Sequence, residues 1–544
     1  MPNQLVILPI LLPFVAAVAN LLMHNRRHAQ AVVNVAALSL TLASGLWMAA
    51  STYAGPDVAG PVLTSQMGNW PAPFGITVAC DLFSAALLCV ASLVAMGVYL
   101  YVLSQTPLRF AGGYFHAVFP LLVLGVNWAF LAGDLFNLFV SFEVMLLASY
   151  TLLVVGTTVR QMRQAYKYVL LNLVVSAVFV ASCGWLYGKL GTLNFAELAL
   201  LSREGYVDAR AAVAVAALAF VFATKAAAFP LWFWLPDTYP TLPPALGGMY
   251  AGLLTKVGIY ALVRLLLMTF GSSEVVLDAL TPLVLASAAG TMFLGVLGAV
   301  SSRTVRRILS IHVISQVGYM VLGIGLAMAA LLAMGRRPDA NDLAVVAVAG
   351  TLLYMIQHMI VKCSLFLCCG LMEKYGGTDD LDGFGALLQR DRWLATVFLI
   401  AALSLVGLPP LSGFFGKFVL IRGSFQQGGW DGVALGITAV ATGALTLLSM
   451  AKIWSYGFWS AAPADSKTAV EPPDFRPPRR VAGLLPTTGL VVAALAVGLG
   501  AGFFFDLARG AARGVIDPTN YIRAVLGGSV DPELRPGAQE VAQR

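Results

Sequence analysis

Residues 223–232 read ATKAAAFPLW, and residues 405–417 read LVGLPPLSGFFGK. Each stretch places a lysine within eight residues of a proline, in the middle of a long apolar segment. Proline removes a backbone donor and crowds the preceding turn, so an apolar helix breaks at Pro230 and again at Pro409 and Pro410. A charge in lipid costs roughly 2.5–3.5 kcal/mol on insertion scales. Both stretches therefore predict broken helices whose lysines have a function.

The whole chain has the composition of a membrane protein. Of its 544 residues, 59% are hydrophobic and only 11% are charged, whereas a soluble chain has about 25% charged residues. A spanning helix needs about 20 mostly apolar residues. Lipid cannot form hydrogen bonds with exposed backbone groups, so these segments must be helical. The sequence predicts an all-α polytopic membrane protein with 14 spanning helices, near 4–23, 30–50, 79–103, 114–131, 134–156, 165–188, 211–235, 242–270, 275–298, 303–326, 343–372, 392–424, 431–460 and 481–506.

The two breaks fall in the seventh and the twelfth of these segments. Because they are five helices apart, they cross the membrane in opposite directions. A broken helix repeated in opposite orientation is the pattern of an inverted repeat. We expect two inverted five-helix repeats, helices 4–8 (114–270) and 9–13 (275–460), within one transmembrane domain of residues 1–506. A C-terminal tail would follow at 507–544.

Loop charge predicts the orientation. Sixteen Lys and Arg residues lie on one side of the predicted helices and six on the other. Cytoplasmic loops collect Lys and Arg, so both termini are predicted to lie outside. The first segment is expected to remain as a helix, because its cations, Arg26 and Arg27, follow it instead of preceding it. The net charge of +7 is thus a topology signal, and the scattered basic residues give no case for nucleic-acid binding.

One carboxylate, Glu143, lies well inside the fifth segment with no cation three or four residues away. It is either a proton-accepting group or half of a structural ion pair with another helix. Lys225 precedes the first break and is its expected partner. A buried lysine loses its charge more easily than an exposed one, so Lys225 can alternate between NH3+ and NH2. The alternative is a fixed pair that never changes its charge.

Further ionisable residues lie inside the predicted spans. Lys256 and Lys417 are deep enough to continue a proton pathway from Lys225. Histidine titrates near neutral pH, so two histidines and a neighbouring lysine are candidate links, although a single histidine in an apolar helix is also compatible with a hydrogen-bonded core residue. Arg264 and Lys452 lie nearer the segment ends and are expected to extend to the membrane surface. The candidate links are His312, His358 and Lys362.

The chain carries no recognisable cofactor or catalytic motif. It has no glycine-rich phosphate loop, no triad spacing and no haem or flavin signature. The six cysteines lie in or beside apolar helices without zinc spacing, and are predicted to be packing residues. We therefore expect a transporter and not an enzyme, with no cofactor and no bound metal.

Several motifs resemble the D-type subunits of multisubunit Mrp Na+/H+ antiporters, which are related to antiporter-like subunits of respiratory complex I and membrane-bound hydrogenases. The run TKAAAFPLWFWLP at 224–236 resembles the helix 7 signature of that superfamily. GLLTKVGIY at 252–260 is more similar to the D-type Mrp subunits than to complex I subunits, as are LPPLSGFFGK at 408–417 and YIRAVLG at 521–527. The likeness extends over helices 1 to 14.

The resemblance implies a glutamate–lysine pair matching Glu143 and Lys225, with further lysines on helices 8 and 12 matching Lys256 and Lys417. It also implies a bacterial cytoplasmic membrane, Na+ or K+ exchanged for H+, and partner subunits of the Mrp A, B, C, E, F and G types. Two other functions stay open. One is a proton-pumping subunit of a complex I-type NADH–quinone oxidoreductase or membrane-bound hydrogenase, and the other is a structural scaffold whose charges only assemble helices.

Overall fold

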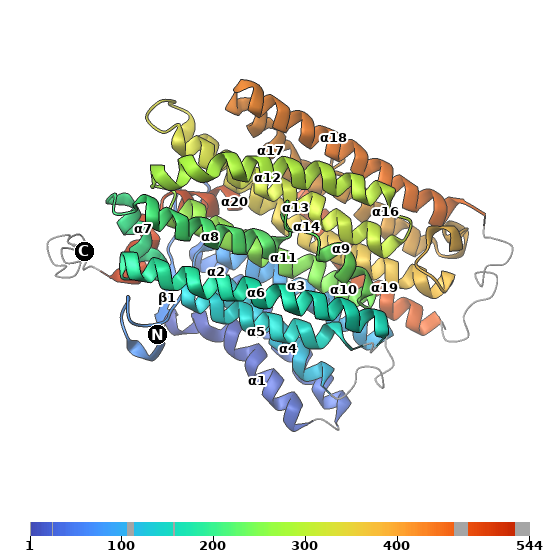
Figure 1. Cartoon of the computed structure of the whole chain (residues 1–544). Coiled ribbons are helices and arrows are strands. Elements are labelled where there is room, and N and C mark those ends of the chain that lie inside the picture. Colours follow the sequence, from blue (N-terminus) through green and yellow to red (C-terminus); the bar gives the residue numbers. More distant parts are fainter. Residues whose placement is uncertain (1, 24–25, 106–113, 156–157, 462–476, 528–544) are drawn as a thin grey trace.

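The computed structural model describes residues 2–23, 26–105, 114–155, 158–461 and 477–527. Within these ranges the chain is a helical bundle with one short β-hairpin (Figure 1). Its α-helices are α1 (Leu8–Leu22), α2 (Arg27–Thr52), α3 (Leu82–Gln105), α4 (Phe115–Leu131), α5 (Leu135–Leu153), α6 (Val159–Leu190), α7 (Phe195–Arg203), α8 (Ala209–Ala226), α9 (Leu235–Thr238), α10 (Pro244–Met249), α11 (Thr255–Val263), α12 (Glu274–Ser301), α13 (Val305–Leu332), α14 (Ala340–Gly376), α15 (Leu387–Arg390), α16 (Arg392–Val406), α17 (Ser412–Gln427), α18 (Gly429–Trp454), α19 (Pro477–Leu499), α20 (Ala501–Ile516) and α21 (Thr519–Leu526).

Shorter helical segments and the hairpin complete the fold. The 3-10 helices are η1 (Pro2–Ile7), η2 (Met67–Asn69), η3 (Tyr239–Thr241) and η6 (Leu381–Gly383). Three π-helical segments, which the sequence did not predict, are η4 (Tyr250–Leu254), η5 (Arg264–Thr269) and η7 (Ser455–Trp459). The antiparallel strands β1 (Leu63–Gln66) and β2 (Thr77–Cys80) lie between the second and third predicted segments, and β2 extends into the first two residues of the third, where the prediction had no strand.

The chain is a multi-pass membrane protein. In the described residues, twelve helices are long and apolar enough to cross a membrane. Two shorter apolar helices, 115–131 and 392–406, fall on the fourth and twelfth predicted segments. The all-α polytopic class is confirmed, whereas the count of 14 crossings, the inverted repeats and the division at residue 506 stay predictions.

Both predicted breaks are present. α8 ends at Ala226, and irregular chain containing Pro230 leads to α9. α16 ends at Val406 and α17 begins at Ser412, after Pro409 and Pro410. Gly407 ends α16 with a positive φ of 91°, the left-handed conformation that glycine adopts without steric cost.

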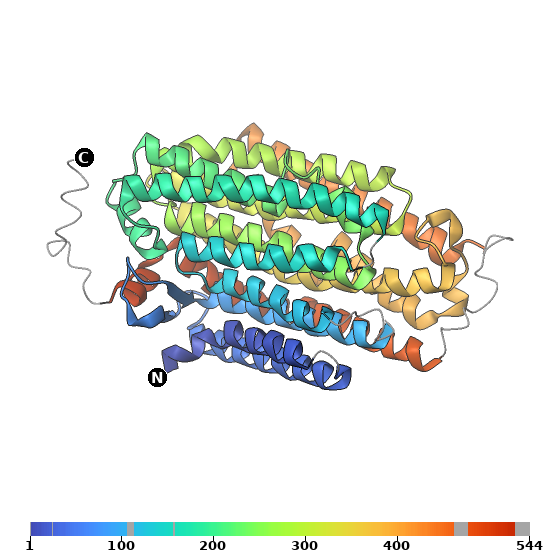
Figure 2. The same cartoon turned by 60° about the horizontal axis from the view of Figure 1, so that its bottom comes forward.

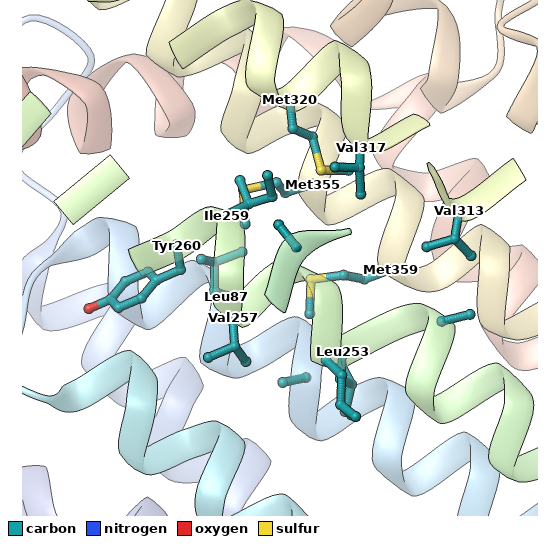
Figure 3. Packing of buried hydrophobic residues seen from close by; sticks show 14 of the residues in the cluster. Leu87, Leu253, Val257, Ile259, Tyr260, Val313, Val317, Met320, Met355 and Met359 are labelled. Atoms are coloured by element: carbon teal, nitrogen blue, oxygen red, sulfur yellow. The ribbon is translucent and has the colours of Figure 1, made fainter. Parts of the chain in front are cut away.

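Three inner segments form the centre of the bundle. We compare the share of residues that are buried in the most apolar stretch of each segment. This share is 100% in residues 244–269 and 94% in both α13 and α14, against 33% in α12. The helix α12 therefore lies at the periphery of the bundle. Figure 3 shows their apolar packing: Ile259 of α11 lies beside Met355 of α14, next to Met320 and Val317 of α13. The ionisable residues of the inner helices are therefore enclosed by apolar side chains.

The two ends of the described chain meet at one end of the bundle. β1 packs against η1 and α21, and Arg203 at the end of α7 forms an ion pair with Asp517, 2.8 Å apart. Figure 2 shows α1 and α2 along one edge of the bundle, with the N-terminus at this same end. Beyond residue 506 the chain continues as α20, which packs on α14 and α3, so residues 507–526 are largely helical. Residues 528–544 of the predicted tail lie outside the described residues.

Candidate functional site

Lys225 lies in the last turn of α8, directly before the first break. Its side chain is buried, and its Nζ has no hydrogen-bond partner among the described residues. The Nζ lies 5.1 Å from the ring centre of Phe142 on α5, within the range of a cation–π contact. A buried amine without a hydrogen bond destabilises the folded protein, so its presence indicates a functional role.

Glu143 follows Phe142 on α5 and is half-buried. It accepts a hydrogen bond of 2.5 Å from the Ser176 hydroxyl on α6. Its charge interacts with that of Lys225, but the two side chains are not hydrogen-bonded. The structure thus places the predicted partners as neighbouring charges on α5 and α8 without direct contact.

Lys256 is fully buried at the start of α11. Its Nζ donates to the Ala251 carbonyl at 2.6 Å and to the Thr255 hydroxyl at 3.1 Å. Ala251 belongs to η4, and a π-helical turn displaces carbonyls from the usual α-helical pairing. The π segment therefore supplies the acceptor that holds Lys256.

Lys417 is buried on α17, across the second break from α16. Its Nζ donates to the carbonyls of Leu405 and Val406 at 2.9 and 3.0 Å. The last carbonyls of any helix lack partners within that helix, and here a lysine eleven to twelve residues further along the chain supplies them. The same Nζ lies 4.8 Å from the ring centre of Tyr319 and 5.9 Å from that of Tyr354.

His312, His358 and Lys362 lie between these lysines in the fully buried part of α13 and α14. His312 exchanges hydrogen bonds with Ser315 at 3.3 Å and with Ser449 at 2.5 Å. Lys362 donates to the Leu309 carbonyl at 2.9 Å. His312 is therefore hydrogen-bonded in the core, as one of the two interpretations of the sequence expects.

His358 differs from His312, because neither of its ring nitrogens has a partner in the described part of the chain. It interacts electrostatically with Lys256, Lys362, Lys417 and His312. His358 thus connects the α11 lysine with the second half of the row. Two free nitrogens fit a group that receives and passes on a proton or holds water.

Comparison with known proteins agrees with this geometry. A family model described as NADH:quinone oxidoreductase/Mrp antiporter, transmembrane, matches residues 132–337 and 340–443, more than half of the chain. The chain belongs to this family. It is 39% identical to the D-type Na+/H+ antiporter subunit of Alkalihalophilus pseudofirmus and 32% identical to that of Bacillus subtilis, in each case over 96% of this chain and 99% of the relative.

Solved structures extend the likeness to three dimensions. A chain of the Mrp complex from Dietzia sp. DQ12-45-1b matches with a TM-score of 0.83 and 31% identity, over 96% of this chain and 100% of the other. A chain of an archaeal membrane-bound sulfane sulfur reductase matches with a TM-score of 0.80 at 23% identity, which shows the shared fold alone. The predicted resemblance to Mrp antiporter subunits is confirmed, and the antiporter relatives are transporter subunits instead of enzymes.

In this antiporter-family chain, a set of neutral polar residues that the sequence did not reveal links the row. The Tyr354 hydroxyl donates to the Gln316 side-chain oxygen, and Gln316 Nε2 donates to Ser315 at 2.9 Å. Ser315 contacts His312, so the set reaches Ser449 on α18. The sequence signal was present in Ser315-Gln316, two polar residues one turn beyond His312 in an apolar helix.

The prediction for Arg264 was wrong. Its guanidinium does not extend to the membrane surface but is buried in η5 and pairs with Asp81 through two hydrogen bonds of 2.6 and 2.5 Å. It also donates to Tyr260 at 3.0 Å and to Ser84 at 2.8 Å. Asp81 directly precedes α3, so sequence spacing gave no hint of this pair.

Lys452 is only half-buried near the end of α18, and its ammonium has defined partners there. Its Nζ donates to the carbonyls of Val300 and Ser302 at 2.8 and 2.5 Å. It therefore caps the C-terminal end of α12, where carbonyls are left unpaired and positive charge is favoured. Neither Arg264 nor Lys452 belongs to the central row.

Proposed function

We propose that this chain is the proton-carrying subunit of a multisubunit Na+(or K+)/H+ antiporter in a bacterial cytoplasmic membrane. It would assemble with Mrp-type A, B, C, E, F and G subunits, with both termini outside. The observation that carries the proposal is the row of buried ionisable side chains near the broken helices and through the inner helices. A row of this kind is expensive in a bilayer and marks an ion or proton pathway.

In the proposed path, protons pass between Glu143 and Lys225 at the first break and continue through Lys256 and His358. They then reach Lys362, His312 and Lys417. Among the described residues, the Lys225 Nζ and both ring nitrogens of His358 have no hydrogen-bond partner, which supports transfer at these points because no such bond has to break before a proton arrives. Water molecules bridging polar groups fit the remaining gaps.

The test replaces Lys225 or Glu143 with Ala in the assembled complex. Everted membrane vesicles are energised, Na+ or K+ is added, and proton release is followed with a pH-sensitive dye. We expect the exchange rate of each variant to be at least about tenfold lower than that of wild type, because every proton must pass through each residue of the path in turn. Lys167→Ala is the matched control, since that lysine is exposed and forms only a surface ion pair with Asp237. Wild-type exchange by an assembled Lys225→Ala complex would contradict the proposal.

The redox-linked alternative has its own discriminator. The family description covers quinone oxidoreductases as well as antiporters, so membrane fractions are tested with and without an electron donor. An antiporter subunit moves protons in response to an added cation without electron flow. Proton movement that requires a reduced donor and stops with a respiratory inhibitor favours the oxidoreductase instead.

A further inference from the structure

The end of α16 forms a small acceptor site around the Lys417 ammonium. Carbonyls of Leu405 and Val406 face it at 2.9 and 3.0 Å. They are the unpaired C-terminal groups of a helix whose dipole carries partial negative charge at this end. We call this group, together with the Ser404 carbonyl, the α16 cradle.

Two aromatic rings lie against the same ammonium. Tyr319 and Tyr354 lie 4.8 and 5.9 Å from it, and their hydroxyl groups are engaged elsewhere, with the Ala439 carbonyl and with Gln316. The electron-rich faces of aromatic rings attract cations within about 6 Å. The rings therefore add a second kind of cation-binding surface to the carbonyls.

A spare oxygen lies beside the cradle. Gln357 on α14 donates its Nε2 to the Ser404 carbonyl at 3.3 Å, while its Oε1 has no partner in the part of the chain that the structure describes. The side chain is fully buried. A buried amide oxygen without a donor is unusual in a native structure and indicates a ligand or water.

These groups fit one positive charge of low density. The hydrogen bonds and ring contacts described for the Lys417 ammonium involve neutral groups only, whereas Ca2+ and Mg2+ are held mainly through carboxylates. Carbonyls at the end of an interrupted helix are a known way to hold Na+ in transporters, and rings of carbonyls select K+ in channels. We propose that the α16 cradle is a monovalent-cation site which the Lys417 ammonium fills as a tethered cation, and that Na+ or K+ enters when Lys417 is neutral.

The exchange conserves charge. Lys417 passes one proton to a neighbouring group or water and becomes an amine, and one monovalent cation then takes the vacated place at the carbonyls. The titratable groups that face Lys417 are the two tyrosines named above, together with His312 on α13 and His358 and Lys362 on α14. This step rests on the proposed function, since it joins proton movement along the row to cation binding at one point.

The test is cation binding to the assembled complex with Lys417→Ala. At pH 7 we expect the variant to bind one more radioactive Rb+ or Na+ per complex than wild type, and Ca2+ not to compete. Adding Gln357→Leu to Lys417→Ala should weaken this extra binding at least fivefold, because the spare oxygen is lost. The same number of bound ions in wild type and variant overturns the proposal, as does extra binding that Gln357→Leu leaves unchanged.

A second measurement covers a Lys417→Ala complex that does not assemble. Wild-type complex is titrated with Rb+ from pH 7 to pH 10, and one additional ion is expected at the alkaline end. Its binding should be weakened in Gln357→Leu alone, and a pH-independent ion count contradicts the site. Failure of the proposed function is distinguishable, because it is read from exchange rates of Lys225 and Glu143 variants and not from binding.

Discussion

The two broken helices solve the same backbone problem in different ways. At the first break the free groups of Phe229 are met by hydroxyls of α12: Thr291 accepts from its N–H at 2.7 Å, and Ser287 donates to its carbonyl at 2.7 Å. At the second break the Lys417 ammonium meets the free carbonyls itself. The Lys225 ammonium therefore binds no backbone carbonyl at its break in the described residues, whereas the Lys417 ammonium is hydrogen-bonded to two.

The two lysines therefore differ in how far a change in their charge affects the stability of the fold. A lysine without a hydrogen bond can gain and lose a proton with little effect on packing. A lysine that holds two helix-terminal carbonyls cannot lose its charge without weakening the break. The first break is suited to proton transfer. The second is suited to coupling the loss of a proton from Lys417 to the binding of a cation at the α16 carbonyls.

The largest expected effect on stability comes from Lys417→Met. It removes the donor from two buried carbonyls, each costing about 1–3 kcal/mol when left unpaired, so the free energy of unfolding should fall by about 2–6 kcal/mol. Thermal or denaturant unfolding of the purified complex measures it. Unchanged stability would show that water or a bound cation replaces the ammonium fully, and it would remove the contrast between the breaks.

Thr291→Val should have the next largest effect. It removes the acceptor of the Phe229 N–H while conserving side-chain volume. Because Phe229 is partly exposed, the expected cost is about 0.5–1.5 kcal/mol. The variant is compared with Thr438→Val on α18, whose exposed hydroxyl bonds only within its own helix. If Thr291→Val and Thr438→Val unfold alike, the α12 hydroxyls do not hold the first break.

Ser176→Ala tests the other side of the first break. It removes the hydrogen bond to Glu143, and a bond to a charged group contributes about 1.5–3 kcal/mol at most. Because Glu143 is half-buried and solvent can replace the lost donor, we expect the free energy of unfolding to fall by about 1 kcal/mol or less. Exchange should slow severalfold, measured as dye response in everted vesicles. An unaffected rate would mean that Ser176 does not position Glu143.

Lys225→Met should change stability least. The variant removes a buried amine that has no hydrogen bond to any residue the structure describes, so the free energy of unfolding should stay within about 1 kcal/mol of wild type or rise slightly. Exchange should nevertheless be lost. A Lys225→Met complex that is as unstable as Lys417→Met would show that the two lysines have the same structural role.

The architecture could be predicted from sequence because lipid allows few solutions. Apolar length predicted the helices, and Pro230, Pro409 and Pro410 predicted the breaks. The lysines at the breaks were visible as charges in apolar segments. Contacts between helices were not visible in the same way. Asp81 and Arg264 are 183 residues apart, and nothing local marks them as partners.

The residues of the candidate site could be predicted from the sequence, but their hydrogen bonds and contacts could not. Glu143 and Lys225 were expected as a pair, yet their relation depends on Ser176 and Phe142, which come from packing of α5 on α6 and α8. The role of Gln357 and the π-helical turn that holds Lys256 arise from tertiary packing, which single-sequence patterns do not encode.

The buried Arg264 cluster has a consequence for biosynthesis. Its guanidinium pairs with Asp81 before α3 and also lies 5.7 Å from the ring centre of Tyr521 in α21. The ribosome makes Asp81 first, Arg264 later and Tyr521 near the end. A nascent chain therefore keeps a buried arginine partly uncovered until α21 has been synthesised and docked. Chains that terminate before α21 would therefore keep a charged side chain without its full cover inside the bundle.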